Sequence, residues 1–307
     1  MTCLVSGSTG LIGSAFVKAA SAWGWHVLAA ARNVPKAELL FAGLKDVKVV
    51  EWDVSRPAVL VDEIDCIVHA ASETASKAFV EHPDEVRRII VEGTRNALSL
   101  AAEKHVKAMV FLSTMEVYGV PDKDPVTEAD FGFLDPSSVR SSYPLAKLEA
   151  ERLCRESGLP VSIARLTQTF GPGVVRGDKR VFAQFAEAVA NGRDIVLHTE
   201  GRTCRCYCYI DDAVAAIRTL LEKGVPGEAY NVVNPATYCS IREMAEMLCA
   251  AHPPCKVVVD LAGAEGKGYA PEFKMRLSTA KLEALGWKPR VGLAEAYERM
   301  IASRRMS

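Results

Sequence analysis

Short apolar runs alternate with amphipathic segments through the first two thirds of the chain. The runs have the length of strands, whereas the longer segments repeat apolar residues at three- and four-residue steps, as helices do. This spacing is clearest within residues 83–104, at Val86, Ile89, Ile90, Ala97, Leu98 and Ala101. The pattern predicts strands at 2–6, 26–31, 47–52, 66–70, 108–113 and 161–166, and helices at 13–23, 83–104 and 143–157.

Strands that are apolar along nearly their whole length are typical of a parallel sheet covered by helices on both faces. We therefore predict an α/β fold, a doubly wound parallel sheet of the Rossmann type. After residue 170 the alternation loosens into shorter elements, which we interpret as a smaller, interleaved C-terminal lobe. There we expect helices at 181–191, at 240–251 and from residue 293, and strands at 195–198 and 257–260.

The composition is that of an ordinary globular protein. Of the 307 residues, 49% are hydrophobic and 24% are charged, and the net charge is −1. This balance gives no reason to expect a nucleic-acid partner or a polybasic attachment to a membrane. No stretch reaches the roughly 18 consecutive apolar residues of a membrane helix. A glycine turn at Gly7 follows the first apolar run at once, so we expect no secretory leader.

Nine cysteines, an odd number, are scattered among the predicted strands and helices. This distribution predicts reduced thiols and a cytoplasmic protein rather than a disulfide framework. Cys204, Cys206 and Cys208 alternate and would share one face of a strand, without the CxxC pairs of structural zinc sites. We therefore predict no metal site.

The first chemical motif is a glycine-rich turn between the first strand and the first helix. It reads Gly7-Ser8-Thr9-Gly10-Leu11-Ile12-Gly13. Glycines allow a tight turn and a close approach of the backbone, and the amides at the start of the helix can bind a pyrophosphate. The position of the turn, directly after a strand near residue 1, favours dinucleotide binding over a merely conformational role.

Residues after the next strands are expected to line the same cofactor. Arg32 follows the second strand, where NAD-specific sites usually carry an acidic residue, and its guanidinium can bind a 2′-phosphate. It therefore favours NADP over NAD. Asp53, followed by Val54 at the end of the third strand, is placed to reach the adenine. The small residues Ala70, Ala71 and Ser72 allow the chain to pass close to the cofactor.

The second motif is Tyr143-Pro-Leu-Ala-Lys147. Residues four apart on a helix share a face, so the phenol and the ammonium group can point into one cleft. A neighbouring ammonium group favours the phenolate and so lowers the pKa of a tyrosine. Tyr143 could then take a hydroxyl proton while a hydride leaves the same carbon, and Lys147 could bind the nicotinamide ribose. Thr114 or Ser113, at the end of a strand, could bind the reacting oxygen.

Together these segments resemble the NAD-dependent epimerase/dehydratase family, the extended branch of the short-chain dehydrogenases/reductases. The resemblance rests on Gly7-x-x-Gly10-x-x-Gly13, His69-Ala-Ala, Ser113-Thr-x-Glu-Val-Tyr-Gly119, Tyr143-x-x-x-Lys147, Arg165-Leu-Thr-Gln-Thr-Phe-Gly-Pro172 and Leu277-Ser-Thr-Ala-Lys-Leu-Glu-Ala-Leu-Gly-Trp-Lys-Pro289. It implies a catalytic triad of Thr114, Tyr143 and Lys147. It also implies a nucleotide-linked sugar as substrate, which a tightly bound NAD or NADP oxidises transiently.

One residue departs from the dehydratase pattern of this family. Dehydratases that act on nucleotide sugars carry Thr-Asp-Glu in the loop after the strand, whereas this chain has Met115 in the aspartate position and keeps Glu116. A thioether cannot donate a proton, so the loop favours an epimerase over a dehydratase, with Glu116 still available as a base. Nucleotide-sugar decarboxylases have a similar loop with a small residue in place of the methionine, so that alternative stays open.

The resemblance also implies residues that bind the substrate. Gln168 stands where many relatives place an asparagine near the nucleotide, and Arg205 matches an arginine that binds phosphate. Ser113 is a further candidate. The dinucleotide-binding lobe is then expected at residues 1–166 with a returning segment 204–233, and the substrate-binding lobe at 167–203 and 234–307.

Two other functions remain open beside an epimerase and a decarboxylase. Arg32 favours an NADP(H)-dependent reductase of a keto-sugar or another carbonyl compound. A non-catalytic cofactor sensor would not need the complete set of Thr114, Tyr143 and Lys147.

The family commonly dimerises through paired long helices, so the resemblance implies a homodimer through helices 83–104 and 143–157.

Overall fold

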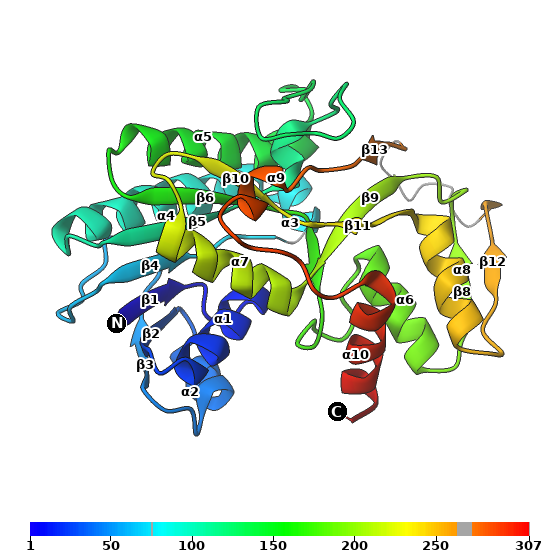
Figure 1. Ribbon diagram of the computed structural model, residues 1–307, viewed down its shortest axis with the longest axis horizontal. Coiled ribbons are helices and arrows are strands. Elements are labelled where there is room, and N and C mark those ends of the chain that lie inside the picture. The colour runs from blue at the N-terminus through cyan, green and yellow to red at the C-terminus, as the bar shows by residue number, and fades with distance from the viewer. Residues whose placement is uncertain (75, 263–271, 307) are drawn as a thin grey trace.

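Seven parallel strands form the main sheet of the computed structural model, which describes residues 1–74, 76–262 and 272–306 (Figure 1). The strands are β1 (Thr2–Ser6), β2 (His26–Ala31), β3 (Val47–Glu51), β4 (Cys66–His69), β5 (Ala108–Thr114), β6 (Val161–Leu166) and β10 (Ala229–Val232). Their order is β10-β6-β5-β4-β1-β2-β3. The order reverses between β1 and β4, which places a crevice for a ligand at the carboxyl ends of these two strands.

Helices cover both faces of this sheet because successive side chains of each strand point to opposite faces. On β1, Cys3 and Val5 pack into one apolar layer and Leu4 into the other. The first layer is closed by α1 (Leu11–Ala22), α2 (Val34–Phe41) and α7 (Ile210–Lys223). The second is closed by α3 (Ser76–Glu81), α4 (Pro83–Glu103) and α5 (Ser142–Glu156). The predicted doubly wound α/β fold is confirmed.

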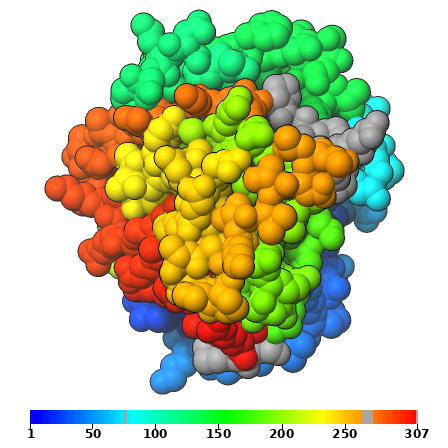
Figure 2. Space-filling model, turned by 90° about the vertical axis from the view of Figure 1, so that its right-hand side faces the viewer, coloured from blue at the N-terminus to red at the C-terminus, as the bar shows by residue number. Residues whose placement is uncertain are grey.

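A smaller lobe lies beyond the carboxyl ends of the strands (Figure 1). Its strands are β7 (Gln168–Phe170), β9 (Cys204–Tyr209), β11 (Asn234–Ser240) and β13 (Lys274–Met275) in one sheet, and β8 (Ile195–Leu197) with β12 (Val257–Val259) in a second. Its helices are α6 (Val181–Ala190), α8 (Ile241–Ala251) and α10 (Leu293–Met306). They pack around buried aromatic side chains such as Phe170, Phe182 and Tyr297. In Figure 2 this lobe faces the viewer.

The chain returns from the smaller lobe to the main lobe within the predicted segment 204–233, but it does so later than predicted. Within the predicted returning segment 204–233, α7 and β10 rejoin the main sheet, whereas β9 pairs with β7, β11 and β13. The return to the main lobe therefore begins at α7. The short α9 (Ala280–Glu283) packs beside β10, so part of the predicted second lobe also contacts the main sheet. Residues 263–271 and 307 of that predicted lobe lie outside the described residues.

The prediction of reduced thiols is wrong for one pair of cysteines. A disulfide joins Cys249, in the last turn of α8, to Cys255, which precedes β12. The other seven cysteines are free, and Cys206 and Cys208 are buried in apolar clusters as the alternation of β9 predicts. Across the described residues, no three His, Cys, Asp or Glu side chains gather as metal ligands. None of the described helices combines the length and apolarity needed to span a bilayer.

Candidate active site

The glycine-rich turn joins β1 to α1 at the reversal of the strand order. Gly7 has a φ of +66°, and an added Cβ there would lie 2.7 Å from the Cα of Ala71. A Cβ on Gly13 would collide with the carbonyl oxygen of Gly7. The turn therefore needs glycine at both positions for steric reasons. Gly10 is the N-cap of α1 and offers no side-chain cap, so the first amides of the helix are left for an anionic ligand.

The segment after β4 closes the other side of the crevice. The amide of Ala71 donates a hydrogen bond to Ser6 Oγ (3.3 Å), and the same hydroxyl bonds His69 Nδ1 at 2.7 Å. Ala70, Ala71 and Ser72 are all partly exposed, beside the glycine turn. The partly exposed Thr9, Leu11 and Ile12 belong to the turn and to the start of α1.

Arg32 and Asp53 lie near each other at the carboxyl ends of β2 and β3. Burial raises the pKa of Asp53, but hydrogen bonds from Ser55 and the charges of Arg32 and Arg56 outweigh it and hold the pKa below its usual value. Arg32 is exposed, whereas Val54 is buried and its carbonyl oxygen accepts a hydrogen bond from Asn96. Both charged side chains can thus reach the adenosine half of a dinucleotide, while Val54 can only pack.

Tyr143 is held in the first turn of α5. Its ring stacks on Phe79 of α3, with ring centroids 4.4 Å apart and an angle of 5° between the planes. Burial and the charge of Glu116 raise the pKa of Tyr143, whereas a hydrogen bond with the Thr114 side chain and the charge of Arg180 act in the opposite direction. The structure therefore brings the predicted Tyr143, Thr114 and Glu116 together at one point.

Lys147 lies one turn further along α5. Its Nζ donates a hydrogen bond to the carbonyl oxygen of Leu112 (2.8 Å) and lies 5.9 Å from the centroid of the Tyr143 ring. Burial lowers the pKa of Lys147 to about 7, although the Cys154 thiol and Glu151 raise it. The ammonium group thus connects α5 to β5. The expectation that it lowers the pKa of Tyr143 is not met, because burial and Glu116 raise that pKa and Lys147 is not among the groups that act on it.

Three guanidinium groups act electrostatically on this point. Burial raises the pKa of Glu116, and the charges of Arg205 and Arg140 oppose this increase. Arg180, at the N-cap of α6, acts on Tyr143 in the same way. Arg205 comes from β9, stacks on Phe273, and keeps a buried Nε without a hydrogen-bond partner among the described residues. The site therefore combines one carboxylate, one phenol, the ammonium group of Lys147 and three guanidinium groups, of which that of Arg180 is paired with Asp178.

Met115 does not face the site. Its side chain is buried in a cluster with Val117, Met275 and Leu277, and its sulfur lies 3.2 Å from Thr167 Oγ1. The position that an aspartate occupies in the dehydratase loop is therefore part of the apolar core in this chain.

Ser113 is also engaged elsewhere. Its hydroxyl donates a hydrogen bond of 2.7 Å to the buried carboxylate of Glu151. Of the two hydroxyl residues predicted at the end of β5, Thr114 therefore contacts Tyr143 and Ser113 contacts Glu151.

Gln168 is placed beside Arg205. Gln168 pairs with Tyr207 across β7 and β9, and Arg205 lies two residues from Tyr207 on the same face of the sheet. Gln168 is partly exposed.

Four residues at the site were not identified from the sequence. Phe79 and Arg140 carry no motif, and Arg180 looks like an ordinary residue before a helix. Glu151 does have a signal, since it lies four residues after Lys147, as Lys147 lies four residues after Tyr143, on one helix face.

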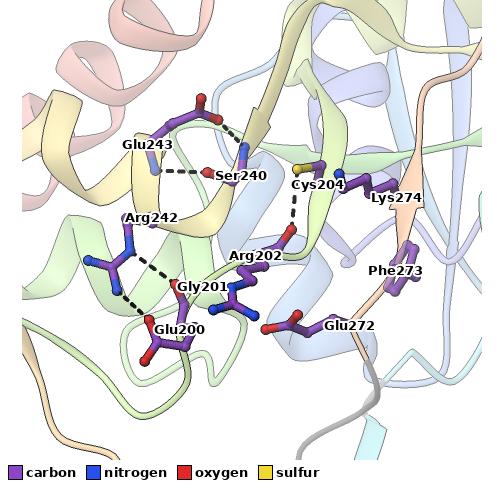
Figure 3. Close-up of a pocket in the computed structure, with 10 residues that line it drawn as sticks. All are labelled: Glu200, Gly201, Arg202, Cys204, Ser240, Arg242, Glu243, Glu272, Phe273 and Lys274. Atoms are coloured by element: carbon purple, nitrogen blue, oxygen red, sulfur yellow. Dashed lines mark hydrogen bonds and ion pairs between the residues drawn. The ribbon is translucent and has the colours of Figure 1, made fainter.

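A cavity of about 740 Å³ opens next to Arg205 in the smaller lobe (Figure 3). It is lined by Glu200, Gly201, Arg202, Cys204, Ser240, Arg242, Glu243, Glu272, Phe273 and Lys274. Two of its acids are already engaged: Glu200 pairs with Arg242 at 3.0 Å, and Glu243 completes the capping box at the start of α8. Phe273 lines the cavity and also stacks on Arg205, so the cavity adjoins the site.

This fold and this site define a dinucleotide-dependent enzyme with a tyrosine–lysine pair. A family model, the NAD dependent epimerase/dehydratase family, matches residues 3–233. The chain belongs to this family of enzymes.

Two relatives align over most of the chain. The chain is 32% identical over 317 residues to UDP-glucuronic acid decarboxylase 6 of Arabidopsis thaliana, covering 98% of this chain and 88% of the relative. It is 31% identical over 254 residues to UDP-N-acetyl-alpha-D-glucosaminuronate decarboxylase of Bacillus cytotoxicus, covering 80% and 78%.

Solved structures share the fold. UDP-glucose 4-epimerase of Thermotoga maritima, with UDP-glucose, has a TM-score of 0.82 at 23% identity and covers 100% of this chain and 99% of its own. dTDP-glucose 4,6-dehydratase of Streptomyces venezuelae, with NAD, has a TM-score of 0.81 at 25% identity and covers 100% and 98%. RMD of Pseudomonas aeruginosa, with NADPH, has a TM-score of 0.78 at 23% identity and covers 100% and 99%.

Proposed function

We propose that the chain is an NAD(P)-dependent decarboxylase of a nucleotide-linked hexuronic acid. The observation that carries the proposal is the set of three guanidinium groups, from Arg140, Arg180 and Arg205, that act on Glu116 and Tyr143. Such a site suits a substrate with a carboxylate in addition to its diphosphate. The decarboxylases among the relatives support the same substrate class.

The chemistry needs few proton transfers. A bound nicotinamide dinucleotide supplies reversible acceptance of a hydride from the sugar carbon. Tyr143 takes the proton of the same hydroxyl, assisted by the hydrogen bond with Thr114, while the ammonium group of Lys147 lies 5.9 Å from the centroid of its ring. The resulting ketone lies two carbons from the carboxylate carbon, so carbon dioxide can leave with its bonding electrons flowing to the ketone oxygen.

Glu116 is then placed to return a proton to the carbon that lost the carboxylate. Burial raises its pKa, so the carboxyl group can hold that proton. No second acid is needed at position 115, whereas elimination of water needs one at the leaving hydroxyl. The buried Met115 thus fits loss of carbon dioxide better than dehydration.

The nucleotide half is proposed to bind on the other side of Arg205. Gln168 and Arg205 would contact the diphosphate, and the base would enter the cavity beside Phe273, where Arg202 and Lys274 supply positive charge (Figure 3). Around the cofactor, Gly7, Gly10, Gly13, Asp53 and Ala71 would hold the dinucleotide, and Arg32 favours NADP over NAD.

Epimerisation is the second candidate. The set of Thr114, Tyr143 and Lys147 also suffices for transient oxidation without loss of carbon, and the buried Met115 is equally compatible with it.

For both candidate reactions we propose that the protein is cytoplasmic and forms a homodimer. The proposed interface is made by α4 and α5, which pack side by side.

Product mass distinguishes these reactions. The purified protein is incubated with NAD or NADP and with UDP-glucuronic acid, UDP-N-acetylglucosaminuronic acid or UDP-glucose, beside a Tyr143→Phe control. We expect a product lighter by one carbon dioxide from a uronic acid only. A product of unchanged mass but new configuration would replace the decarboxylase by the epimerase, and absence of any conversion would contradict both.

A further inference from the structure

Helix α5 carries a third charged residue on the face of Tyr143 and Lys147. Glu151 lies two turns beyond Tyr143, and it is completely buried. Its carboxylate accepts hydrogen bonds from Arg165 Nε at 2.9 Å and from an Arg165 terminal nitrogen at 2.7 Å. Arg165, on β6, is also completely buried. A buried ion pair is costly to desolvate and adds little stability by itself, so this pair invites a functional explanation.

The same carboxylate connects α5 to β5. Three consecutive residues of β5 each bind one residue of the helix face. The Leu112 carbonyl oxygen accepts from Lys147 at 2.8 Å, Ser113 donates to Glu151 at 2.7 Å, and the Thr114 side chain is hydrogen-bonded to Tyr143. The position of the phenol and of the ammonium group is thus set together with that of Glu151.

We propose that Glu151 is a positioning residue that fixes Tyr143 and Lys147 against β5 and, as a buried anion, favours the protonated form of Lys147. The proposal deepens the proposed function, because it concerns the same tyrosine–lysine pair.

The groups around Lys147 support this role. His69 faces it from β4, and burial lowers the pKa of His69 to about 3, so that the ring is neutral. Cys154 follows on α5, and burial raises its pKa to about 12, so that the thiol is neutral as well. Burial alone would raise the pKa of Glu151, but Arg165 and Ser113 hold it below its usual value. Glu151 is therefore the anion next to Lys147 at neutral pH.

Arg165 sets the orientation of this anion. One terminal nitrogen donates to Tyr118 Oη at 3.0 Å and to the Glu128 carbonyl oxygen at 2.8 Å. Arg155 adds a hydrogen bond of 2.8 Å to Glu151 from the partly exposed side. The carboxylate is thus held by hydrogen bonds from β5, β6 and α5.

The test measures Lys147 directly and needs no substrate. Protein labelled with ¹³C-lysine is titrated by NMR, and the Lys147 signal is assigned by its loss in Lys147→Met. We expect Lys147 to titrate near the neutral range in the unchanged protein and at least about one pH unit lower in Glu151→Gln, because an opposite charge typically shifts a pKa by one to three units. Ser113→Ala keeps the charge of Glu151, so the pKa of Lys147 should not change in that variant. Equal titration of Lys147 in Glu151→Gln and the unchanged protein would overturn the proposal.

Glu151→Gln leaves the buried Arg165 without its anion, so two further variants accompany it. Glu151→Asp keeps the charge and should retain the titration of Lys147 while lowering kcat through the shorter side chain. Glu151→Gln combined with Arg165→Met removes both charges. In this double variant the pKa of Lys147 should lie between its value in Glu151→Gln and its value in the unchanged protein. If Glu151→Gln does not fold, the double variant decides the test. A Lys147 pKa in the double variant equal to that of the unchanged protein would then contradict the proposal.

The activity profile separates this proposal from the proposed function. If the enzyme converts a nucleotide sugar, the loss of kcat at alkaline pH should move to lower pH in Glu151→Gln, with an unchanged KM. An equal loss of kcat at every pH would indicate a merely structural role. If no nucleotide sugar reacts, the proposed function fails, while the NMR titration still decides the role of Glu151.

Discussion

The sulfur of Met115 lies 3.2 Å from Thr167 Oγ1, inside an apolar cluster and away from Tyr143. The hydroxyl of Thr167 is itself bonded to the carbonyl oxygen of Cys206 at 2.6 Å, so it has no proton left for a second acceptor. A polar group at position 115 would therefore be buried without a donor. The residue that separates this chain from the dehydratase pattern belongs to the core.

Met115→Asp should consequently destabilise the protein without creating a dehydratase. Burial of an unpaired carboxylate is expected to cost several kcal/mol, so the free energy of unfolding should fall by about 3 kcal/mol or more. Met115→Leu, of similar volume, should cost less than about 1.5 kcal/mol. Denaturant unfolding of both variants measures the difference, and a stable Met115→Asp protein that eliminates water from a nucleotide sugar would refute this interpretation.

Gly13→Ala tests the glycine turn. An added Cβ would collide with the Gly7 carbonyl oxygen. The backbone of the turn or of the start of α1 must therefore move to accommodate the alanine. Overpacking of this kind typically costs 1–3 kcal/mol, and dinucleotide binding should weaken by about tenfold or more. Calorimetric titration with NAD and NADP gives the affinity. Gly292→Ala is the matched control, because a Cβ there meets no atom within 4 Å.

Tyr143→Phe removes the phenol and keeps the ring that stacks on Phe79. Turnover should fall by about 10²–10⁴-fold, as for the loss of a general acid–base group, while dinucleotide affinity and stability stay close to those of the unchanged protein. Steady-state kinetics and thermal unfolding are measured side by side. Turnover that survives in the phenylalanine variant would remove Tyr143 from the proposed mechanism.

Six of the seven strands of the main sheet were predicted, because most of them are apolar runs buried on both faces. β3 is only partly buried, and the four-residue β10 was not predicted. The strands β7, β11 and β13 could not be predicted, because they are short and depend on pairing with β9, far away in the sequence. Among the site residues, spacing identified Tyr143 and Lys147, but it left the choice between Ser113 and Thr114 open. The orientation of β5 against α5 decides that choice, and only packing sets this orientation.

The choice of cofactor depends on Arg32. Its guanidinium is exposed and lies close enough to Asp53 to lower that residue's pKa. If Arg32 binds a 2′-phosphate, Arg32→Ala should weaken NADP binding by about tenfold or more, in keeping with a charge-assisted hydrogen bond of 1.5–3 kcal/mol. NAD binding should change far less. Equal effects on the two dinucleotides would show that Arg32 does not select between them.

His69 predicts how stability depends on pH. The ring is fully buried, and burial followed by the charge of Lys147 lowers its pKa from 6.5 to about 3. Between these two values the unfolded chain binds the proton and the folded protein does not, so lowering the pH through this window favours unfolding. Proton binding to His69 in the unfolded chain should reduce the free energy of unfolding by about 2 kcal/mol at pH 5 relative to pH 8. Denaturant unfolding at the two pH values measures it. His69→Asn, which can still bond Ser6, should lose this part of the pH dependence, and an unchanged slope in that variant would assign the acid sensitivity to other groups.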